Sequence, residues 1–494
     1  MSRFRLPIDP SFPADEQPTI GIIGMGAMGR MYAHHLSTAG WANIRVCDRP
    51  ETYDTLLTQF TSPSSPSNIT VLKDGHAVSR TSDFLMYSVE AEFIDRIVKE
   101  YGPSTKMGCI VSGQTSVKQP EIEAFEKWLP EDVEIVTIHS LHGPTVSTEG
   151  QPLVITQHRA SDASRQLVEC ILSSFKSRFV HLSYKEHDLV TANTQAVIHA
   201  AFLSMGTAWC AKASYPWEQG LYVGGIETVK VNIMLRIYSN KWHVYAGLAI
   251  LNPFARIQID QFARSTTEIY RLMVLGDEGG LRERMYKSRD AVFGPPGSVR
   301  RKRPILLSPH VLDKFDLGKI QPGEEGKPRK PTPNSHLSLL AMVDCWAHLD
   351  IDPFHHLTLA ATPLFRLFLG VAEYLFLAPL LDDSVPPSPS IPSQSLSAIS
   401  STSPPSQSTP SPSHSPHLDT AIHSAIHDSW HRTDDLEFVV AARGWSQCVS
   451  FASFEVYRQR FEETSGFFEG RFEEAGELGK EMIRVVVESS AGED

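Results

Sequence analysis

Cysteine is scarce in this sequence, and the few that occur form no cluster. The 494 residues contain six cysteines, and no two of them make a C-x-x-C pair. This spacing indicates neither a disulfide framework nor a zinc site built from paired cysteines. Scattered thiols fit a reducing compartment, so we expect a cytoplasmic protein.

Excess positive charge and an unbroken hydrophobic run are also missing. The net charge is −12 at pH 7, whereas a nucleic-acid-binding protein usually carries a basic face. The most apolar long stretch, residues 357–381, is interrupted by Pro363, Arg366 and Glu373, which favours a buried helix over a membrane span. Residues 1–18 are polar and lack the apolar core of a secretion signal. We therefore expect neither nucleic acid nor a membrane as a partner.

A glycine-rich turn near the N-terminus lies in the setting of a dinucleotide-binding unit. Residues 19–23 form a short β-branched run that indicates a buried strand, and residues 24–29 read G-M-G-A-M-G. A helical segment follows, and a second strand, residues 44–47, ends at Asp48. This order predicts a Rossmann-type βαβ unit that binds a dinucleotide. The candidate cofactor-binding residues are Gly24, Met25, Gly26, Ala27, Met28, Gly29, Asp48, Arg49 and Ser88.

The residues after the second strand leave the choice of cofactor open. Asp48 can accept a hydrogen bond from a ribose 2′-hydroxyl, which favours NAD. Arg49 can pair with a 2′-phosphate, which favours NADP, or can be merely solvated. These two residues alone support NAD and NADP about equally.

The N-terminal part of the chain, residues 18–185, alternates short apolar strands with helices. Strands are expected at 84–89, 109–112, 134–138, 153–156 and 179–182. Such a pattern predicts a parallel sheet covered on both faces, with ligands at the carboxyl ends of its strands. Ser88 and His139 fall at such ends.

The rest of the chain predicts a second, all-helical domain, so the fold class is α/β plus all-α. Strand patterns nearly vanish after residue 185, and residues 186–381 read as helices of a substrate and dimerisation domain. Residues 382–417 are low-complexity Ser/Pro sequence, which predicts a disordered insertion. Helical pattern resumes at 418–494, and residues 1–17 form an N-terminal tail.

Two histidines follow the strand at 134–138. His139 leaves the strand at the ligand-binding edge, where a neutral imidazole can accept a proton from a substrate hydroxyl. His139 and His142 also form an H-x-x-H pair, but no third ligand is evident and the segment is not helical. We therefore predict no metal site. A structural role for each histidine remains the simpler interpretation of that residue alone.

Three further stretches carry candidate site residues. On a regular helix Gln195 and His199 share a face, which can line a cleft between domains. Arg236 lies in an otherwise apolar helix and needs an anionic partner, either a substrate carboxylate or an internal acid. Ser116 follows a strand and can bind cofactor or substrate, although a helix N-cap is the competing role.

In combination these motifs resemble the prephenate dehydrogenase family, and most closely its fungal NADP-dependent members. The H-x-x-x-G-P run that starts at His139 is similar to the family's catalytic motif, and Q-T-S-V-K up to Lys118 to its serine loop. The E-H-D segment leading to His199 resembles its first interdomain helix. R-I-Y-S-N from Arg236, with Tyr245 and alanine after it, resembles its substrate-binding helix.

The resemblance implies oxidative decarboxylation of prephenate to 4-hydroxyphenylpyruvate with reduction of NADP⁺, in tyrosine biosynthesis, by a homodimer. His139 would accept the proton of the ring hydroxyl as hydride leaves the same carbon. Arg236 would bind a substrate carboxylate, and His199 and Gln195 would help to hold the substrate. Ser116 would orient His139 or the nicotinamide.

Other functions stay open at this point. Arogenate carries an ammonium where prephenate has a keto group, and no residue in the sequence identifies the contact to that group. A regulator that senses NADP without turnover is a second alternative, but retention of all four candidate catalytic and substrate residues argues against it. A β-hydroxyacid dehydrogenase would need a catalytic lysine, and Lys212 and Lys230 lie in no such motif. Bacterial members commonly read His-Pro-Met where Ser140 and Leu141 follow the histidine here.

Overall fold

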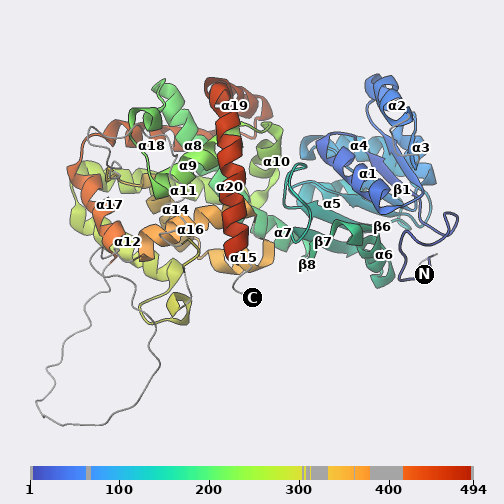
Figure 1. Ribbon diagram of the computed structural model, residues 1–494, viewed down its shortest axis with the longest axis horizontal. Coiled ribbons are helices and arrows are strands. Elements are labelled where there is room, and N and C mark those ends of the chain that lie inside the picture. The colour runs from blue at the N-terminus through green and yellow to red at the C-terminus, as the bar shows by residue number, and fades with distance from the viewer. Residues whose placement is uncertain are drawn as a thin grey trace, which may run out of the picture.

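The protein consists of a sheet with helices on both faces, followed by a larger all-helical part (Figure 1). The structure is a computed structural model that describes residues 4–62, 68–302, 305–307, 312, 332–360, 362–378 and 415–490. The α/β plus all-α fold class is thereby confirmed. Most of the expected Ser/Pro insertion lies outside the described residues, and a helix already begins at Pro416.

Eight strands form one sheet in the order β3-β2-β1-β4-β5-β6-β7-β8. Neighbouring strands from β3 to β6 pair in parallel, and β3-β2-β1-β4-β5-β6 is the order of a dinucleotide-binding fold. The strands are β1 (Ile20–Ile23), β2 (Ile44–Cys47), β3 (Ile69–Val71), β4 (Phe84–Tyr87), β5 (Ile110–Gly113), β6 (Glu134–Ser140), β7 (Pro152–Arg159) and β8 (Arg178–His181). The carboxyl ends of β1, β4, β5 and β6 therefore meet at one edge.

The expectation of a wholly parallel sheet is wrong at one pair. Strands β6 and β7 are antiparallel, with His139 opposite Val154. The connection between them, residues 141–151, contains no helix. A parallel return needs a longer crossover, usually a helix, so this short connection brings the chain back in the opposite direction. Strand β8 is parallel to β7 because the helix α6 (Asp162–Leu172) connects them.

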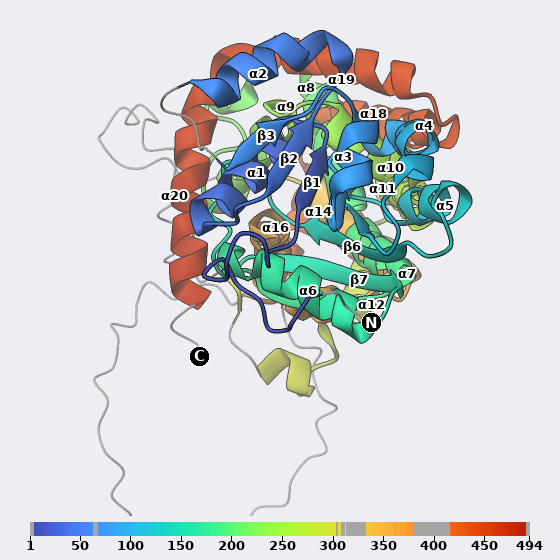
Figure 2. The same cartoon turned by 90° about the vertical axis from the view of Figure 1, so that its right-hand side faces the viewer.

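Each face of the sheet has its own apolar core. Ile22 belongs to the core under α1 (Ala27–Ala39) and α6, whereas the next residue, Ile23, belongs to the opposite core. The second core lies under α3 (Gly75–Thr81), α4 (Ile94–Tyr101) and α5 (Gln119–Trp128). Figure 2 shows α1 on one side of the strands and α3, α4 and α5 on the other. Alternate side chains of each strand thus enter opposite cores, as in a covered parallel sheet.

The helical part is built around one large apolar core. Its helices are α7 (Tyr184–Thr191), a π-helix (Ala192–Ala196), α8 (Val197–Ala211), α9 (Gly225–Tyr238), α10 (His243–Leu251), α11 (Pro253–Leu275), α12 (Glu278–Phe293), α14 (Leu337–His348), α15 (Pro353–Ala360), α16 (Pro363–Leu377), α17 (Pro416–His427), α18 (Arg432–Ser450), α19 (Phe454–Phe468) and α20 (Phe472–Ser490). The helix α2 (Tyr53–Thr61) belongs to the sheet part. None of the described helices has the length and apolarity that crossing a membrane would require.

Candidate active site

The glycine turn after β1 has the geometry that a dinucleotide requires. Gly24 has a φ of +98°, and a Cβ there would lie 2.3 Å from the carbonyl oxygen of Ser88. A Cβ on Gly29 would lie 2.1 Å from the carbonyl oxygen of Gly24, so both positions need glycine. A Cβ on Gly26 would meet no heavy atom within 4 Å, and no side chain caps α1 there. The open space and the free N–H groups of α1 fit a pyrophosphate.

The other candidate cofactor residues surround this turn. The backbone N–H of Ser88 donates to the carbonyl oxygen of Ile23 at 2.8 Å, which places Ser88 beside the turn. Asp48 lies directly after β2, and its Oδ1 accepts the N–H of Arg49 at 2.9 Å. The Arg49 side chain is exposed.

The turn's own side chains differ in exposure. Met25 is buried in the core, so only its backbone can face a cofactor. Ala27 is exposed and Met28 is half-buried, directly beside the open space at the glycine turn. The backbone of the turn, more than these side chains, therefore forms the surface on which a phosphate can rest.

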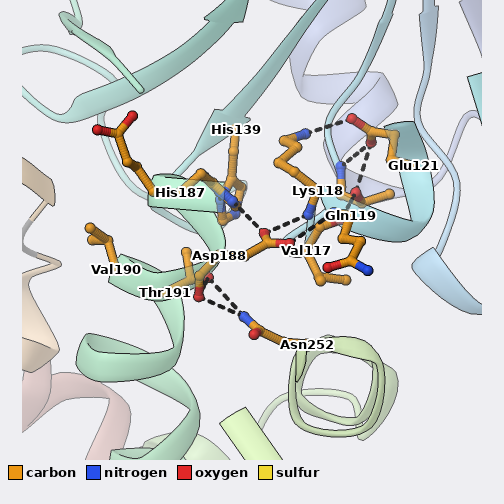
Figure 3. A network of polar contacts seen from close by, with 12 residues as sticks. Val117, Lys118, Gln119, Glu121, His139, His187, Asp188, Val190, Thr191 and Asn252 are labelled. Carbon is orange, nitrogen blue, oxygen red and sulfur yellow. Dashed lines mark hydrogen bonds and ion pairs between the residues drawn. The ribbon is translucent and has the colours of Figure 1, made fainter. Parts of the chain in front are cut away.

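His139 lies at the end of a chain of hydrogen bonds that runs into α5 (Figure 3). Its Nδ1 is 2.8 Å from Nε2 of His187, and Nδ1 of His187 is 2.8 Å from Oδ1 of Asp188. The same carboxylate accepts the backbone N–H of Lys118 at 2.6 Å and that of Gln119 at 2.8 Å. Asp188 thus caps α5 and also holds the two histidines in line.

The acid at the end of the chain decides which imidazole nitrogen is free. A carboxylate only accepts hydrogen bonds, so Nδ1 of His187 donates to Asp188 and Nε2 of His187 is an acceptor. Nδ1 of His139 must then carry the hydrogen that is donated to His187. This leaves Nε2 of His139 as a lone-pair acceptor, and it makes no hydrogen bond within the described part of the chain.

Burial keeps both histidines neutral. Removal from water lowers the pKa of His139 well below its usual value, and the neighbouring His187 and Lys118 lower it further. Burial likewise lowers the pKa of His187. Burial raises the pKa of Asp188 to about 6, against the opposing effect of the two N–H groups that it accepts. At neutral pH the chain therefore consists of two neutral imidazoles and one carboxylate.

A buried ion pair fixes the backbone under His139. Lys118 and Glu121 are fully buried and lie 2.8 Å apart. The Lys118 ammonium also donates to the carbonyl oxygen of Ile138 at 2.6 Å and to the hydroxyl of Thr137 at 3.0 Å. Residues next to His139 in β6 are thus tied to the start of α5, which limits movement of the imidazole.

Ser116 has a different position from either role that the sequence suggested. It is half-buried and forms no hydrogen bond with His139 among the described residues. The N-cap of α5 is Lys118, which uses no side-chain cap of its own, so the capping alternative for Ser116 is wrong. Asp188 from α7 replaces such a local cap. Ser116 lies two residues before the cap, beside the network, with its hydroxyl available to a ligand.

Gln195 and His199 do not lie on one regular helix. Gln195 belongs to the π-helix, and α8 begins only at Val197, so the expected i, i+4 geometry does not apply. The wide turn is held from outside, because Asn252 donates to the carbonyl oxygen of Asp188 at 2.8 Å. Gln195 is half-buried.

His199 and Arg236 meet at Tyr245. The rings of His199 and Tyr245 are nearly perpendicular, with centroids 4.7 Å apart, and burial lowers the pKa of His199 to about 3. The buried Nδ1 of His199 has no hydrogen-bond partner among the described residues. Tyr245 also acts electrostatically on Arg236, whose pKa is lowered by burial. Among the described residues no carboxylate forms an ion pair with Arg236. The guanidinium and the imidazole are therefore both available to a ligand.

The helix α20 lies directly against Arg236. A Cβ on Gly479 would lie 2.8 Å from both Cδ and Nη1 of Arg236, and 2.9 Å from Oδ1 of Asn232. The Asn232 amide donates to the carbonyl oxygen of Ala475 at 2.8 Å, which fixes α20 on α9. Glycine at position 479 thus leaves the space that the arginine side chain occupies.

The sequence did not assign roles to four of these residues. His187 and Asp188 were recognised as part of a motif, and Lys118 and Tyr245 as ends of two others, but their contacts could not be read from spacing. The one available signal is chemical: adjacent His and Asp at a helix start, and a lysine next to a serine loop, are costly to bury without a purpose.

Comparisons with known proteins agree with this site. Residues 196–390 and 413–488 match a family model described as a 6-phosphogluconate dehydrogenase C-terminal domain. The chain is 48% identical over 475 residues to prephenate dehydrogenase [NADP(+)] of Saccharomyces cerevisiae, covering 96% of this chain and 94% of that protein. It is also 48% identical to the probable prephenate dehydrogenase [NADP(+)] of Schizosaccharomyces pombe, over 95% of this chain and 98% of that one.

A solved structure is more distant. The prephenate dehydrogenase of Aquifex aeolicus is 18% identical, with a TM-score of 0.43, and the match covers 53% of this chain and 95% of that one. The family rests instead on the two fungal relatives, which match nearly end to end. This chain belongs to the family of the NADP(+)-dependent prephenate dehydrogenases.

Proposed function

We propose that this protein oxidatively decarboxylates prephenate to 4-hydroxyphenylpyruvate with reduction of NADP⁺, as a step of tyrosine biosynthesis. The observation that carries the proposal is His139, a neutral histidine whose Nδ1 is engaged and whose Nε2 is a free acceptor. A free imidazole nitrogen of this kind suits a base that takes a proton from a ring hydroxyl. The family supports the substrate and the cofactor.

In this reaction Nε2 of His139 takes the proton of the substrate's C4 hydroxyl. NADP⁺, when bound at the glycine turn, supplies the acceptor for the hydride that leaves C4. The bond from C1 to the ring carboxylate breaks, its electron pair enters the ring, and CO₂ departs as the ring becomes aromatic. The positive charge on protonated His139 is passed along hydrogen bonds to His187 and is balanced by Asp188.

The substrate is a dianion, and Arg236 is the cation that we assign to one carboxylate. A planar guanidinium binds a carboxylate through two parallel hydrogen bonds, which fixes both position and orientation. His199, neutral and with an unsatisfied Nδ1, supplies a further hydrogen-bonding group beside Tyr245. Gln195 and Ser116, both half-buried, remain our candidates for polar contacts to substrate and nicotinamide.

Arg49 supports NADP over NAD in this proposal. It is exposed at the end of β2, next to Asp48, where the ribose of a dinucleotide lies in this fold. A guanidinium there can pair with a 2′-phosphate, and the two fungal relatives carry NADP(+) in their names.

A matrix of two substrates and two cofactors tests the proposal. The growth of reduced-cofactor absorbance is recorded with prephenate or arogenate, each with NADP⁺ or NAD⁺. Fast reduction with prephenate and NADP⁺ is expected. Reduction with arogenate only would change the substrate and keep the mechanism, whereas preference for NAD⁺ would overturn the role of Arg49. Tight NADP⁺ binding without turnover on either substrate would favour a sensor.

Asp188→Asn is expected to lower kcat by about 10- to 100-fold, because it removes a charge-assisted hydrogen bond worth ~1.5–3 kcal/mol. An amide can keep the bonds to His187 and Lys118 through its oxygen, but its NH₂ group then faces the N–H of Gln119. The opposite orientation donates to His187 and reverses the tautomer of both histidines. The measurement is the pH profile of kcat.

The wild-type profile should fall below about pH 6, since protonated Asp188 can no longer accept from His187. The variant should lose this acidic limb, because an amide does not titrate there. A wild-type limb that persists unchanged in the variant would show that another group controls it. Asp162→Asn, at the exposed start of α6, is the matched control.

Gly479→Ala is expected to raise KM for prephenate by about tenfold with little change in kcat. The new methyl group would displace Cδ and Nη1 of Arg236, and a cost of ~1.4 kcal/mol in carboxylate binding corresponds to that factor. Gly476→Ala is the control, because a Cβ at position 476 meets no atom within 4 Å. Equal KM values for the two variants would remove α20 from the site.

The helical part also carries our proposal of a homodimer in the cytoplasm. Exposed apolar side chains lie on α10, α11 and α18, namely Val244, Ile257, Leu436 and Val440. A second copy that covers them would remove this surface from water. Light scattering of the full chain tests the dimer. The domain division remains as proposed, with boundaries near residues 18, 186, 382 and 418.

A further inference from the structure

A group of potential metal ligands lies far from the candidate active site, between α12 and α17. The two helices run side by side at the end of the helical part that is remote from the sheet (Figure 1). Glu278 is the first residue of α12, and His423 and His427 are one turn apart on α17. One ligand atom from each of the three residues lies within 4.8 Å of the others.

The geometry of the group is close to what a cation needs. Nε2 of His427 is 3.0 Å from Oε2 of Glu278, and the two histidine rings lie 4.3 Å apart between centroids. Histidines at i and i+4 present their nitrogens on one face of a helix. Around a zinc ion with bonds of ~2.0–2.1 Å, tetrahedral ligand atoms lie roughly 3.3 Å apart. Small side-chain rotations therefore suffice to close the site.

The carboxylate is already oriented for this purpose. Oε1 of Glu278 accepts a hydrogen bond from Arg282 at 3.0 Å, which leaves Oε2 facing His427. Arg282 also bonds Asp419, one turn before His423 on α17, and the hydroxyl of Tyr286 donates to Asp419 at 2.8 Å. Such outer hydrogen bonds hold a ligating carboxylate in place and tune its affinity.

We propose that Glu278, His423 and His427 form a binding site for a divalent transition-metal cation of the zinc type. Two imidazoles and one carboxylate supply three ligands, and water completes the coordination. The cation would join α12 to α17 and so stabilise the helical part, without a role in hydride transfer. This differs from our sequence-based expectation of no metal, because Glu278 is distant from the histidine pair in the sequence.

Exposure and charge set how the site should behave. The side chains of Glu278 and His427 are 34% and 51% exposed, so a cation can enter and leave without unfolding. A ligand that binds only the folded state raises thermal stability in proportion to the logarithm of its concentration above Kd. Imidazoles bind metal only when neutral, so binding should weaken as the pH falls below about 6.5.

The test is a zinc titration of the tag-free full chain by calorimetry, alongside visible absorption with Co²⁺. We expect one equivalent of Zn²⁺ to bind more tightly than any other, with a rise in Tm. His423→Gln and Glu278→Gln should each weaken this equivalent by at least about tenfold and abolish the rise in Tm. The cobalt spectrum should show the strong bands of a four-coordinate site.

His181→Gln is the matched control. His181 lies 2.8 Å from Glu169 and is 52% exposed, but it is paired with one acid and belongs to no three-ligand group among the described residues. This variant should keep the tight equivalent. Identical titrations for wild type and both site variants would overturn the proposal, even if zinc binds elsewhere. Unchanged Tm of the metal-free variants shows that they fold, so loss of binding can be attributed to the ligands.

Discussion

His139→Asn is expected to lower kcat with prephenate and NADP⁺ by about 10²–10⁴-fold. Asparagine can still donate a hydrogen bond to His187, so the chain to Asp188 can persist. It offers no basic nitrogen, however, and the proton of the C4 hydroxyl then has no acceptor while hydride departs. The barrier rises because positive charge develops on the carbinol carbon without relief.

The measurement is single-turnover reduction of NADP⁺, which separates the chemical step from substrate binding and product release. Binding of NADP⁺ and Tm should stay near wild-type values. His142→Asn is the control, because the ring of His142 contacts only the adjacent carbonyl of Gly143, at 3.0 Å. Similar losses in both variants would mean that the segment, and not its base, matters. A fully active His139 variant would assign the base to another group.

The features that the sequence predicted well are local ones. The turn at residues 24–29 requires glycine for reasons that lie within a few bonds of the chain, namely a positive φ at Gly24 and the close approach of Gly29 to Gly24. Strands buried on both faces appear as apolar runs, so most of the sheet could be placed from composition alone. Short strands such as β3 lack that signal and were missed.

The features that were missed depend on contacts between distant residues. Asp188 caps α5 from 70 positions away, and nothing near Lys118 in the sequence announces it. The antiparallel β7 follows from a connection that lacks a helix, and the π-helix is held by Asn252 from another helix. A site residue can thus be recognised by its type and motif, but the atoms that position it come from tertiary packing.

The order of the hydrogen bonds then adds chemistry that neither motif contains. The sequence presents His139, His187 and Asp188 as separate candidates or as none. Once they are in line, the carboxylate determines the tautomer of two rings and leaves one specific nitrogen, Nε2 of His139, as the acceptor. The direction of proton transfer is therefore a property of the fold.

Arg236→Gln is expected to raise KM for prephenate by about 10²-fold or more, since loss of a charge-paired contact costs ~2–5 kcal/mol. The guanidinium has no acid partner among the described residues, so the substrate is the anion that it can pair with. Removing an unpaired, half-buried cation should leave Tm equal or higher, because desolvation of the charge is relieved. Initial rates and thermal unfolding are measured on the same preparation.

The two measurements together separate a substrate role from a structural one. If Arg236 balanced an internal acid, its loss would leave that acid buried and unpaired, and Tm would fall while KM changed little. If it binds substrate, KM rises while Tm holds, and Arg236→Lys, which keeps the charge but not the planar fork, should recover only part of the affinity. The free guanidinium beside Tyr245 and His199 has a cost in the empty protein that only an anionic ligand offsets. For this reason the substrate carboxylate, and not an internal acid, is the partner that the geometry favours.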